Sequence, residues 1–512
     1  MTNVILISTD QQRADSLGCY GNRLARTPHI DELAGRGATF ISHVTPNQIC
    51  SPSRATLFSG RYARHHGLTH NGIALGEHVR LLTHDFKDNG YATYGVGKFH
   101  FQPILAPAEF AMPDSNAFWQ KPEAENWNGP FYGFDSVDIL IGESAVAARF
   151  GHYANWLKRT APEAAELYLA ENALEPRPAD LDEAWKCAVP EHLHYNSWVA
   201  DRACNFIDEK GADGPFFMFV SFPDPHHPFS PPAPWCNMFD PAQMPTPAVA
   251  NGELDLMPAY IARGEGESED EDGSDTSYFE FLLNPGAPRE QGFMQTTSHI
   301  STDTMKLVTA LTYGSVAMID NCIGRILAKL DDAGLGDNTL ILFTSDHGEL
   351  LGDHGLIRKG PTPYRQLLQV PLIITGPRVK PGIRSQLTSH VDIRATLQDY
   401  LGFPTDSGDG ISLSSLLQDP EAEGRDVQFA EFHPRAVSEQ YNHTLITPDW
   451  RLTIYPLHEG WGELFDRKAD PNEHHNLFHD ERHRHVRDEL WRQLNRRWSP
   501  APDAGGRSIA VY

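Results

Sequence analysis

Short apolar runs that end in polar, reactive residues recur along the chain. These runs cover residues 4–9, 92–96, 216–222 and 339–345. Because apolar and polar residues do not alternate within them, the runs are typical of central strands in a parallel sheet that is covered on both faces. Residues 303–333 carry apolar side chains at spacings of three, four or seven, which predicts an amphipathic helix. The pattern predicts an α/β fold with a large, mostly parallel sheet flanked by helices.

The residues that follow the four predicted strands share a reactive character. They are Asp10 and Gln11, Lys98 and His100, His226, and Asp346 and His347. In doubly wound sheets, ligands bind beyond the carboxyl ends of the strands. We therefore expect these side chains to converge on one site, although they are distant in sequence.

The character of the sequence changes near residue 425. Three short strands are predicted at residues 427–432, 443–446 and 451–455, and the segment 462–466 follows them. Residues 481–498 predict a helix with many charges. This end of the chain therefore predicts a small antiparallel sheet with one helix packed on it.

At 512 residues the chain is too long for one simple core. We predict a catalytic α/β domain over residues 1–425 and a small C-terminal α+β subdomain over residues 426–512. Two long stretches without periodicity, at about 101–190 and 230–300, interrupt the first domain, and loops of this length are usually functional lids or mobile segments. The first is rich in aromatic residues. The second contains the acidic run 265–275, which predicts a solvated loop, with cation binding as the alternative.

The charge and the cysteines narrow the class of protein. The 42 Lys and Arg residues are outnumbered by 68 Asp and Glu residues, and a net charge of −26 argues against nucleic acid or anionic lipid as a partner. The six cysteines lack the spacing of zinc or redox motifs, which predicts reduced thiols. No signal peptide or run of membrane-spanning length is found. The expected location is the cytoplasm, with no membrane as a partner.

A cysteine, a proline and an arginine at fixed spacing stand just ahead of an apolar, helix-like run. Cys50, Pro52 and Arg54 form the pattern Cys-x-Pro-x-Arg. Because proline suits the first turn of a helix, Cys50 is predicted at a helix N-terminus. Free N–H groups and the helix dipole favour an anion there. The alternative interpretation is a buried, inert cysteine, since free cysteine is among the most buried residue types.

This pattern resembles the modification signature of the formylglycine-dependent sulfatases. The resemblance implies that a formylglycine-generating maturation enzyme oxidises Cys50 to an aldehyde, which hydrates to a gem-diol. One diol oxygen would attack sulfur, and deprotonation of the other hydroxyl would expel sulfate. One displacement thus becomes two easier steps. A serine would instead be left as a stable sulfate ester.

The resemblance extends to a site for one divalent metal. It implies Asp10, Gln11, Asp346 and His347 as ligands, together with Cys50. Many sulfatases carry Asp-Asp and Asp-Asn at these two strand ends, an all-oxygen set that suits calcium. The Asp-Gln and Asp-His pairs depart from that pattern toward the phosphonate monoester hydrolase and choline sulfatase branches. Because an imidazole favours manganese or another transition metal, calcium and manganese both stay open.

The remaining polar residues resemble the sulfatase anion pocket. They are the catalytic residues Arg54, Lys98, His100, His226 and Lys359 and the substrate-binding residue Asn71. The resemblance implies that Arg54, Lys98 and Lys359 stabilise charge on the sulfuryl oxygens. His226 or Lys359 would protonate the leaving oxygen, and His100 would act as the base that releases sulfate.

Together the motifs identify a member of the sulfatase branch of the alkaline-phosphatase-like superfamily. The Lys98/His100 pair favours hydrolysis of a small sulfate ester, and an aryl sulfate in particular, over the alternatives. The Asp-His metal pair and the long insertions favour a phosphonate monoester or phosphodiester hydrolase with the same nucleophile. An aromatic cage for choline sulfate is a further option. A catalytically retired metal-binding scaffold, in which Cys50 stays a thiol, is the alternative outside the enzymes. We expect a homo-oligomer, with the tail 501–512 either fraying or docking on a neighbouring subunit.

Overall fold

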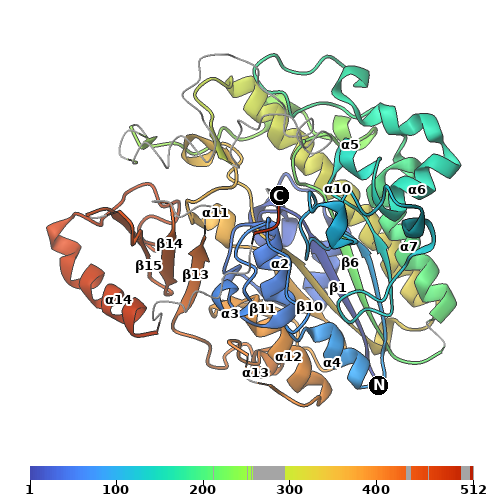
Figure 1. Ribbon diagram of the computed structural model, residues 1–512. Helices are drawn as coiled ribbons and strands as arrows, with labels where there is room; N and C mark the ends of the chain where they lie inside the picture. The colour runs from blue at the N-terminus through green and yellow to red at the C-terminus, as the bar shows by residue number, and fades with distance from the viewer. Residues whose placement is uncertain are drawn as a thin grey trace.

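The computed structural model describes residues 1–210, 213–250, 252–254, 257, 294–406, 408–433, 440–458, 460–497 and 508–510. An eight-stranded sheet forms the centre of the larger part of the molecule, and a four-stranded sheet lies to one side of it (Figure 1). The acidic run at residues 265–275 lies outside the described residues.

The large sheet is mostly parallel, as predicted. Its strand order is β11-β2-β10-β8-β1-β6-β4-β5. The four predicted strands are confirmed as β1 (Asn3–Thr9), β4 (Ala92–Gly97), β6 (Phe216–Phe222) and β8 (Thr339–Ser345). The outer strands are shorter: β2 (Ala38–Phe40), β5 (Ser136–Ile139), β10 (Leu372–Thr375) and β11 (Gly382–Arg384). Strand β10 runs antiparallel to both neighbours, whereas the strands from β8 to β5 are all parallel.

The register of the central strands brings their carboxyl ends to one level. Thr9, the last residue of β1, pairs with Phe222 of β6 and with Ser345 of β8. Just beyond the sheet, the N–H of Asp346 donates to the Thr9 carbonyl at 3.1 Å. Parallel pairing therefore sets the residues that follow these strands side by side.

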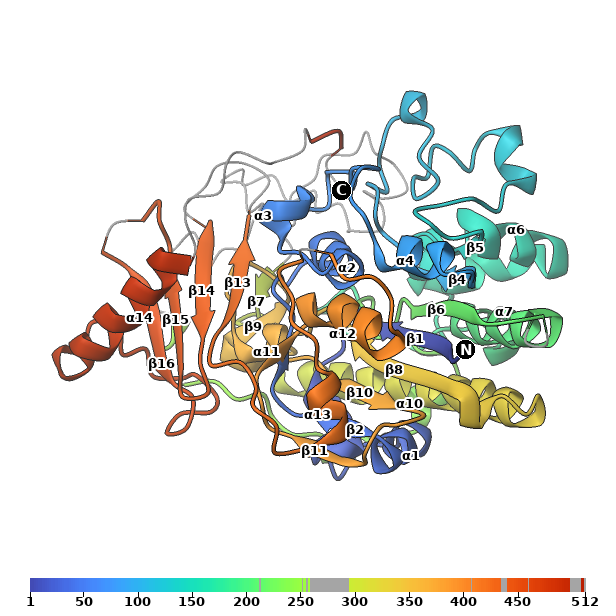
Figure 2. The same ribbon diagram turned by 90° about the horizontal axis from the view of Figure 1, so that it is seen from below.

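Alternate residues of β1 enter two separate cores. Val4 and Leu6 pack on one face of the sheet, and Ile5 and Ile7 pack on the other. The first face is covered by α2 (Cys50–Ser59), α4 (Leu82–Asp88) and α12 (Val391–Leu401). The second face is covered by α1 (Pro28–Arg36), α7 (Tyr195–Lys210) and α10 (Thr302–Asp332). Figure 2 shows α2 and α12 on one side and α1 and α10 on the other. This double coverage explains the unbroken apolar runs in the middle of β1 and β8.

Helix α10 confirms the predicted amphipathic helix. The Ser301 side chain caps it by accepting a hydrogen bond from the N–H of Thr304. By length and composition this helix could cross a membrane, but 78% of its most apolar window is buried inside the molecule. It has the burial of a core helix and packs beside α7 on the second face of the sheet.

The small sheet is antiparallel, in the order β13-β14-β15-β16. Its strands are β13 (Gln428–Phe432), β14 (Asn442–Ile446), β15 (Trp450–Ile454) and β16 (Gly462–Asp466). Helix α14 (Arg484–Arg497) packs on it, since Leu490 and Leu494 share a core cluster with Leu445 and Leu452. The predicted small sheet with one helix is confirmed, and the domain boundary at residue 425 stays a prediction.

The first long stretch contains an aromatic core of its own. Phe118, Trp119 and Trp127 pack edge to face, with ring centroids 5.5 to 6.3 Å apart. Phe131 and Phe134 are buried in the cluster that covers the first face of the sheet. Because these rings pack against one another, the structure favours a loop core over a cage for a quaternary ammonium group.

Candidate active site

Helix α2 carries the cysteine of the Cys-x-Pro-x-Arg pattern at its N-terminus. Cys50 is the first residue of the helix, and every residue of α2 is buried. The helix ends at Gly60, whose φ of 66° lies in the left-handed region that favours glycine. A buried helix thus presents residue 50 at the carboxyl edge of the sheet.

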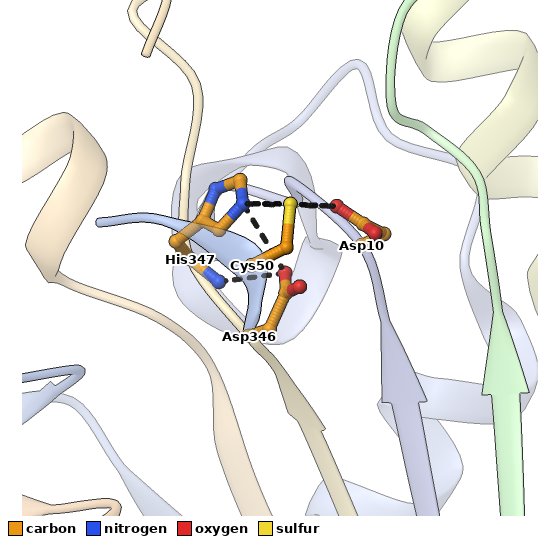
Figure 3. Close-up of side chains that lie close together, drawn as sticks. All are labelled: Asp10, Cys50, Asp346 and His347. Atoms are coloured by element: carbon orange, nitrogen blue, oxygen red, sulfur yellow. Dashed lines mark hydrogen bonds and ion pairs between the residues drawn. The ribbon is translucent and has the colours of Figure 1, made fainter. Parts of the chain in front are cut away.

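The Cys50 side chain lies where the strand ends meet (Figure 3). Its Sγ atom is 3.8 Å from Asp10 Oδ1, 3.3 Å from His347 Nε2 and 2.9 Å from Lys359 Nζ. Asp346 lies beside them, and its Oδ1 accepts a hydrogen bond from the N–H of His347 at 2.8 Å. All five side chains are buried. The structure therefore brings these sequence-distant residues into one site.

Four of these residues have the arrangement of a metal-binding group. Asp10, Cys50, Asp346 and His347 each offer one ligand atom, and these atoms lie within 4.8 Å of one another. His347 Nε2 is 3.7 Å from a carboxylate oxygen of each aspartate. Ligands around one cation are separated by roughly 3 to 4 Å, so the donor set fits a divalent metal. Burial lowers the pKa of His347 to about 4, which keeps the imidazole in the neutral form that binds metals.

Gln11, the remaining predicted ligand, connects this group to Lys359. Its backbone is left-handed, with φ at 64°, and its N–H donates to Asp346 Oδ1 at 3.0 Å. The side-chain Oε1 accepts a hydrogen bond from Lys359 Nζ at 2.9 Å, while Nε2 contacts His227 and Glu349. The carbonyl oxygen therefore lies at the edge of the metal group, and its role as a ligand stays a prediction.

Arg54 lies one turn along α2 and fixes the two carboxylates of the metal group. Its Nε donates to Asp346 Oδ2 at 2.9 Å, and its Nη2 donates to Asp10 Oδ2 at 3.1 Å. Its Nη1 donates to the Lys98 carbonyl at 2.6 Å and to Ser221 Oγ at 2.9 Å. These contacts are those of a positioning residue, and the predicted contact with sulfuryl oxygens stays a prediction.

Two lysines and two histidines surround the same point. Lys98 Nζ is 2.7 Å from Asp10 Oδ2. Lys359 Nζ lies 2.9 Å from His226 Nε2. His100 is buried, and burial, Lys98 and Arg54 together lower the pKa of its imidazole well below its usual value. Burial and Lys359 have the same effect on the pKa of His226. Both imidazoles are thus neutral near pH 7.

The electrostatics of the site oppose an unmodified thiol as the nucleophile. Burial alone would raise the pKa of Asp10, but Lys98, Arg54 and Lys359 outweigh it and hold that pKa well below its usual range. Burial and the Asp10 charge raise the pKa of the Cys50 thiol to about 11. Because only the thiolate is a good nucleophile, unmodified Cys50 is poorly suited to attack at neutral pH.

Asn71, predicted to bind substrate, lies between the start of α2 and the C-terminal tail. Its Oδ1 accepts a hydrogen bond from the N–H of Ser51 at 3.1 Å, while its Nδ2 has no hydrogen-bond partner in the described part of the chain. The carbonyl of the next residue, Gly72, accepts a hydrogen bond from the N–H of Ile509 at 3.0 Å. Residues 508–510 therefore dock on their own chain, at the loop that follows α3 (Ala63–His66).

Comparison with protein families decides the class of the protein. Residues 2–403, well over half of the chain, match the family described as Sulfatase. The chain belongs to the sulfatase family. A second match, over residues 352–499, is to the family described as N-sulphoglucosamine sulphohydrolase, C-terminal. The predicted sulfuric ester hydrolase of the alkaline phosphatase superfamily is thereby confirmed.

Relatives of this sulfatase span nearly its whole length. The arylsulfatase of Clostridium perfringens (strain 13 / Type A) is 28% identical over 497 residues, which cover 94% of this chain and 91% of that protein. The multifunctional alkaline phosphatase superfamily protein PehA of Trinickia caryophylli is 29% identical over 517 residues, which cover 93% of this chain and 91% of that protein. The solved phosphonate monoester hydrolase of Agrobacterium radiobacter has a TM-score of 0.75 at 27% identity, covering 96% and 95% of the two chains. These likenesses confirm the predicted alkaline-phosphatase-like fold.

Sequence reasoning missed two buried carboxylates in the sulfatase site. Glu349 contacts Gln11 and stands three residues after the predicted ligand Asp346, so its position in that segment was a usable signal. Glu143 is 3.1 Å from Lys98 Nζ and follows β5. Because β5 is a short edge strand without a long apolar run, its carboxyl end was not recognised as part of the site.

Proposed function

We propose that this sulfatase hydrolyses small sulfate monoesters, and aryl sulfates in particular, through a formylglycine derived from Cys50 with one bound divalent metal ion. The observation that carries the proposal is the position of Cys50 Sγ, 2.9 Å from Lys359 Nζ and 3.3 Å from His347 Nε2. A nucleophile there adjoins a cation, a metal-binding group and a helix N-terminus, and each of these favours an anionic ester.

The side chains around residue 50 support separate roles. As a hydrated aldehyde, residue 50 would offer one hydroxyl to sulfur and a second whose deprotonation releases sulfate. Lys359 is suited to protonate the leaving oxygen, because its Nζ contacts both the Cys50 side chain and His226 Nε2. Lys98 would stabilise charge on the sulfuryl oxygens, and neutral His100 would accept the proton during sulfate release.

The same proposal assigns the metal. Asp10, Asp346, His347 and residue 50 would hold it, with Gln11 as the proposed fifth ligand. When bound, the ion would neutralise a substrate oxygen and lower the pKa of the attacking hydroxyl. We propose manganese rather than calcium, because the donor set includes the imidazole of His347.

A second candidate function is hydrolysis of phosphonate monoesters or phosphodiesters with the same nucleophile. The likeness to the phosphonate monoester hydrolase of Agrobacterium radiobacter supports it, as do the Asp-Gln and Asp-His pairs. Lys98 and His100 support the sulfatase proposal instead, since phosphonate monoester hydrolases as a group tend to lack this pair. Choline sulfate stays an alternative substrate within the sulfatase proposal.

Steady-state kinetics distinguish the two candidates. With 4-nitrophenyl sulfate and 4-nitrophenyl phenylphosphonate, which share a leaving group, we expect kcat/KM to be larger for the sulfate, because this chain carries the Lys98/His100 pair that phosphonate monoester hydrolases as a group tend to lack. The Cys50→Ala variant, assayed in parallel, corrects for contaminating hydrolases. A ratio that favours the phosphonate by several orders of magnitude would remove the aryl sulfatase proposal in favour of the second candidate.

The location and maturation of the protein are further proposals. All six cysteines are free thiols, which supports a reducing compartment, and we propose the cytoplasm. The Cys50 side chain has 0% exposure, so a formylglycine-generating enzyme would have to reach it before the chain folds.

A further inference from the structure

A buried carboxylate faces the anion pocket without belonging to the metal-binding group. Glu143 lies just ahead of α5 (Ser144–Ala147), and its exposure is 0%. Its Oε2 is 3.1 Å from Lys98 Nζ, and its Oε1 is 3.5 Å from His226 Nδ1. The metal-binding group is made of Asp10, Cys50, Asp346 and His347. Glu143 thus places a carboxylate beside two of the proposed catalytic groups.

This carboxylate opposes anion binding at Lys98. Lys98 Nζ is also 2.7 Å from Asp10 Oδ2, so the ammonium group lies between two carboxylates. Burial raises the pKa of Glu143, and the contact with Lys98 counteracts that rise. When Glu143 is ionised, it lowers the positive potential that a bound ester meets. The interaction energy is proportional to the charge of the ester, so a dianion is disfavoured about twice as strongly as a monoanion.

Esters of nearly the same shape differ in their net charge. Sulfate monoesters, phosphonate monoesters and phosphodiesters carry one negative charge at neutral pH, whereas phosphate monoesters carry between about 1.5 and 2. The tetrahedral groups are similar in size, so a pocket that fits one also fits the others. A negative charge in the wall is a repulsive element that discriminates against the dianion.

We propose that Glu143 positions Lys98 and selects monoanionic esters over dianionic phosphate monoesters. The inference rests on the proposed function, because it takes residue 50 as the reacting group and Lys98 as a contact of the ester. It makes Glu143 a specificity-determining residue, and this role explains why a carboxylate lies in an anion pocket.

The Glu143→Gln variant removes the charge and keeps the shape. With 4-nitrophenyl sulfate and 4-nitrophenyl phosphate at about pH 8, we expect the kcat/KM ratio of sulfate to phosphate to fall by about 10-fold to 100-fold. Glu143→Asp keeps the charge and shortens the side chain, so it should lower kcat for both esters and leave the ratio within about 3-fold of the wild-type value. An unchanged ratio in Glu143→Gln, or equal falls in both variants, would overturn the proposal.

A binding measurement tests the same point without turnover. In Cys50→Ala protein, calorimetry with phenyl sulfate and phenyl phosphate compares ligands of similar shape and different charge. Adding Glu143→Gln should lower the Kd of phenyl phosphate by a factor at least about 10-fold larger than the factor for phenyl sulfate. Equal tightening of both ligands would overturn the selection by charge. If the wild-type protein turned over neither ester, the proposed function would fail, and this binding ratio would still decide the role of Glu143.

Glu463→Gln is the matched control. Glu463 is 2% exposed and accepts a hydrogen bond from Arg451 Nη1 at 2.8 Å in the small C-terminal sheet. Like Glu143→Gln, the Glu463→Gln variant removes one buried charge that is paired with a cation. It should leave the kcat/KM ratio and the binding ratio unchanged. The same shift in this variant would reveal a general charge effect and contradict the proposal. If thermal unfolding shows that Glu143→Gln does not fold, Glu143→Ala must give the same shift, or the proposal fails.

Discussion

Replacing Cys50 with alanine is expected to lower kcat/KM for an aryl sulfate by at least about four orders of magnitude. The Cys50 side chain is the point where Lys359 and His347 meet, so the change removes the proposed nucleophile and leaves the surrounding charges in place. Removing one buried sulfur leaves only a small void, so the fold should persist. Kinetics with 4-nitrophenyl sulfate measure the loss, and circular dichroism confirms the fold.

Two further variants test whether the loss of turnover is specific to the chemistry of residue 50. Cys322 is also buried, at 1% exposure in α10, and Cys322→Ala should keep near wild-type turnover. Cys50→Ser should release about one equivalent of nitrophenol and then stop, because a serine sulfate ester has no second hydroxyl to expel sulfate. Full turnover by Cys50→Ala would refute the mechanism.

Arg54→Met is expected to destabilise the metal-free protein by about 3–5 kcal/mol. The arginine side chain is 1% exposed and donates to both Asp10 and Asp346, so its loss leaves two buried carboxylates without their common cation. Added Mn²⁺ should recover part of this stability, since a divalent ion binds the same carboxylates. Denaturant unfolding of chelator-treated protein, with and without Mn²⁺, measures both effects.

Low pH should reduce the difference in the free energy of unfolding between the wild-type protein and Arg54→Met. The pKa of Asp10 is depressed in the folded protein, so the stability that its charge contributes is complete above the unfolded pKa, 3.8, and is lost as the pH falls toward the folded pKa.

Arg451→Met is the matched control, because Arg451 bridges Glu463 and Glu473 and is equally buried. Both variants should lose stability, but Mn²⁺ should rescue only Arg54→Met. Equal rescue of both would contradict a metal site at Asp10 and Asp346.

The long apolar strands made much of this architecture predictable. Strands β1 and β8 are buried on both faces, so each has an unbroken apolar run in its middle, and the reactive residues that follow the strands are easily recognised. Parallel pairing then brings Asp10 and Asp346 together without any detailed knowledge of the loops. The short strands β2, β5, β10 and β11 lack such runs, because three or four residues give no clear periodicity.

The direction of each side chain was harder to predict than its presence in the site. Arg54 was predicted as a catalytic residue, but its hydrogen bonds to two carboxylates depend on long-range packing. Glu143 was missed for the same reason: its contact with Lys98 depends on the pairing of β5 with β4. A sequence pattern fixes which residues follow a strand, whereas tertiary packing decides which groups they contact.

The mass of residue 50 tests the central claim most directly. In protein produced together with a formylglycine-generating enzyme, the tryptic peptide of residues 37–54 should be about 18 Da lighter than the unmodified peptide, because the aldehyde replaces the thiol. It should also react with a hydrazide, as an aldehyde does. A peptide that keeps the cysteine mass in protein that turns over aryl sulfate at full rate would contradict the account.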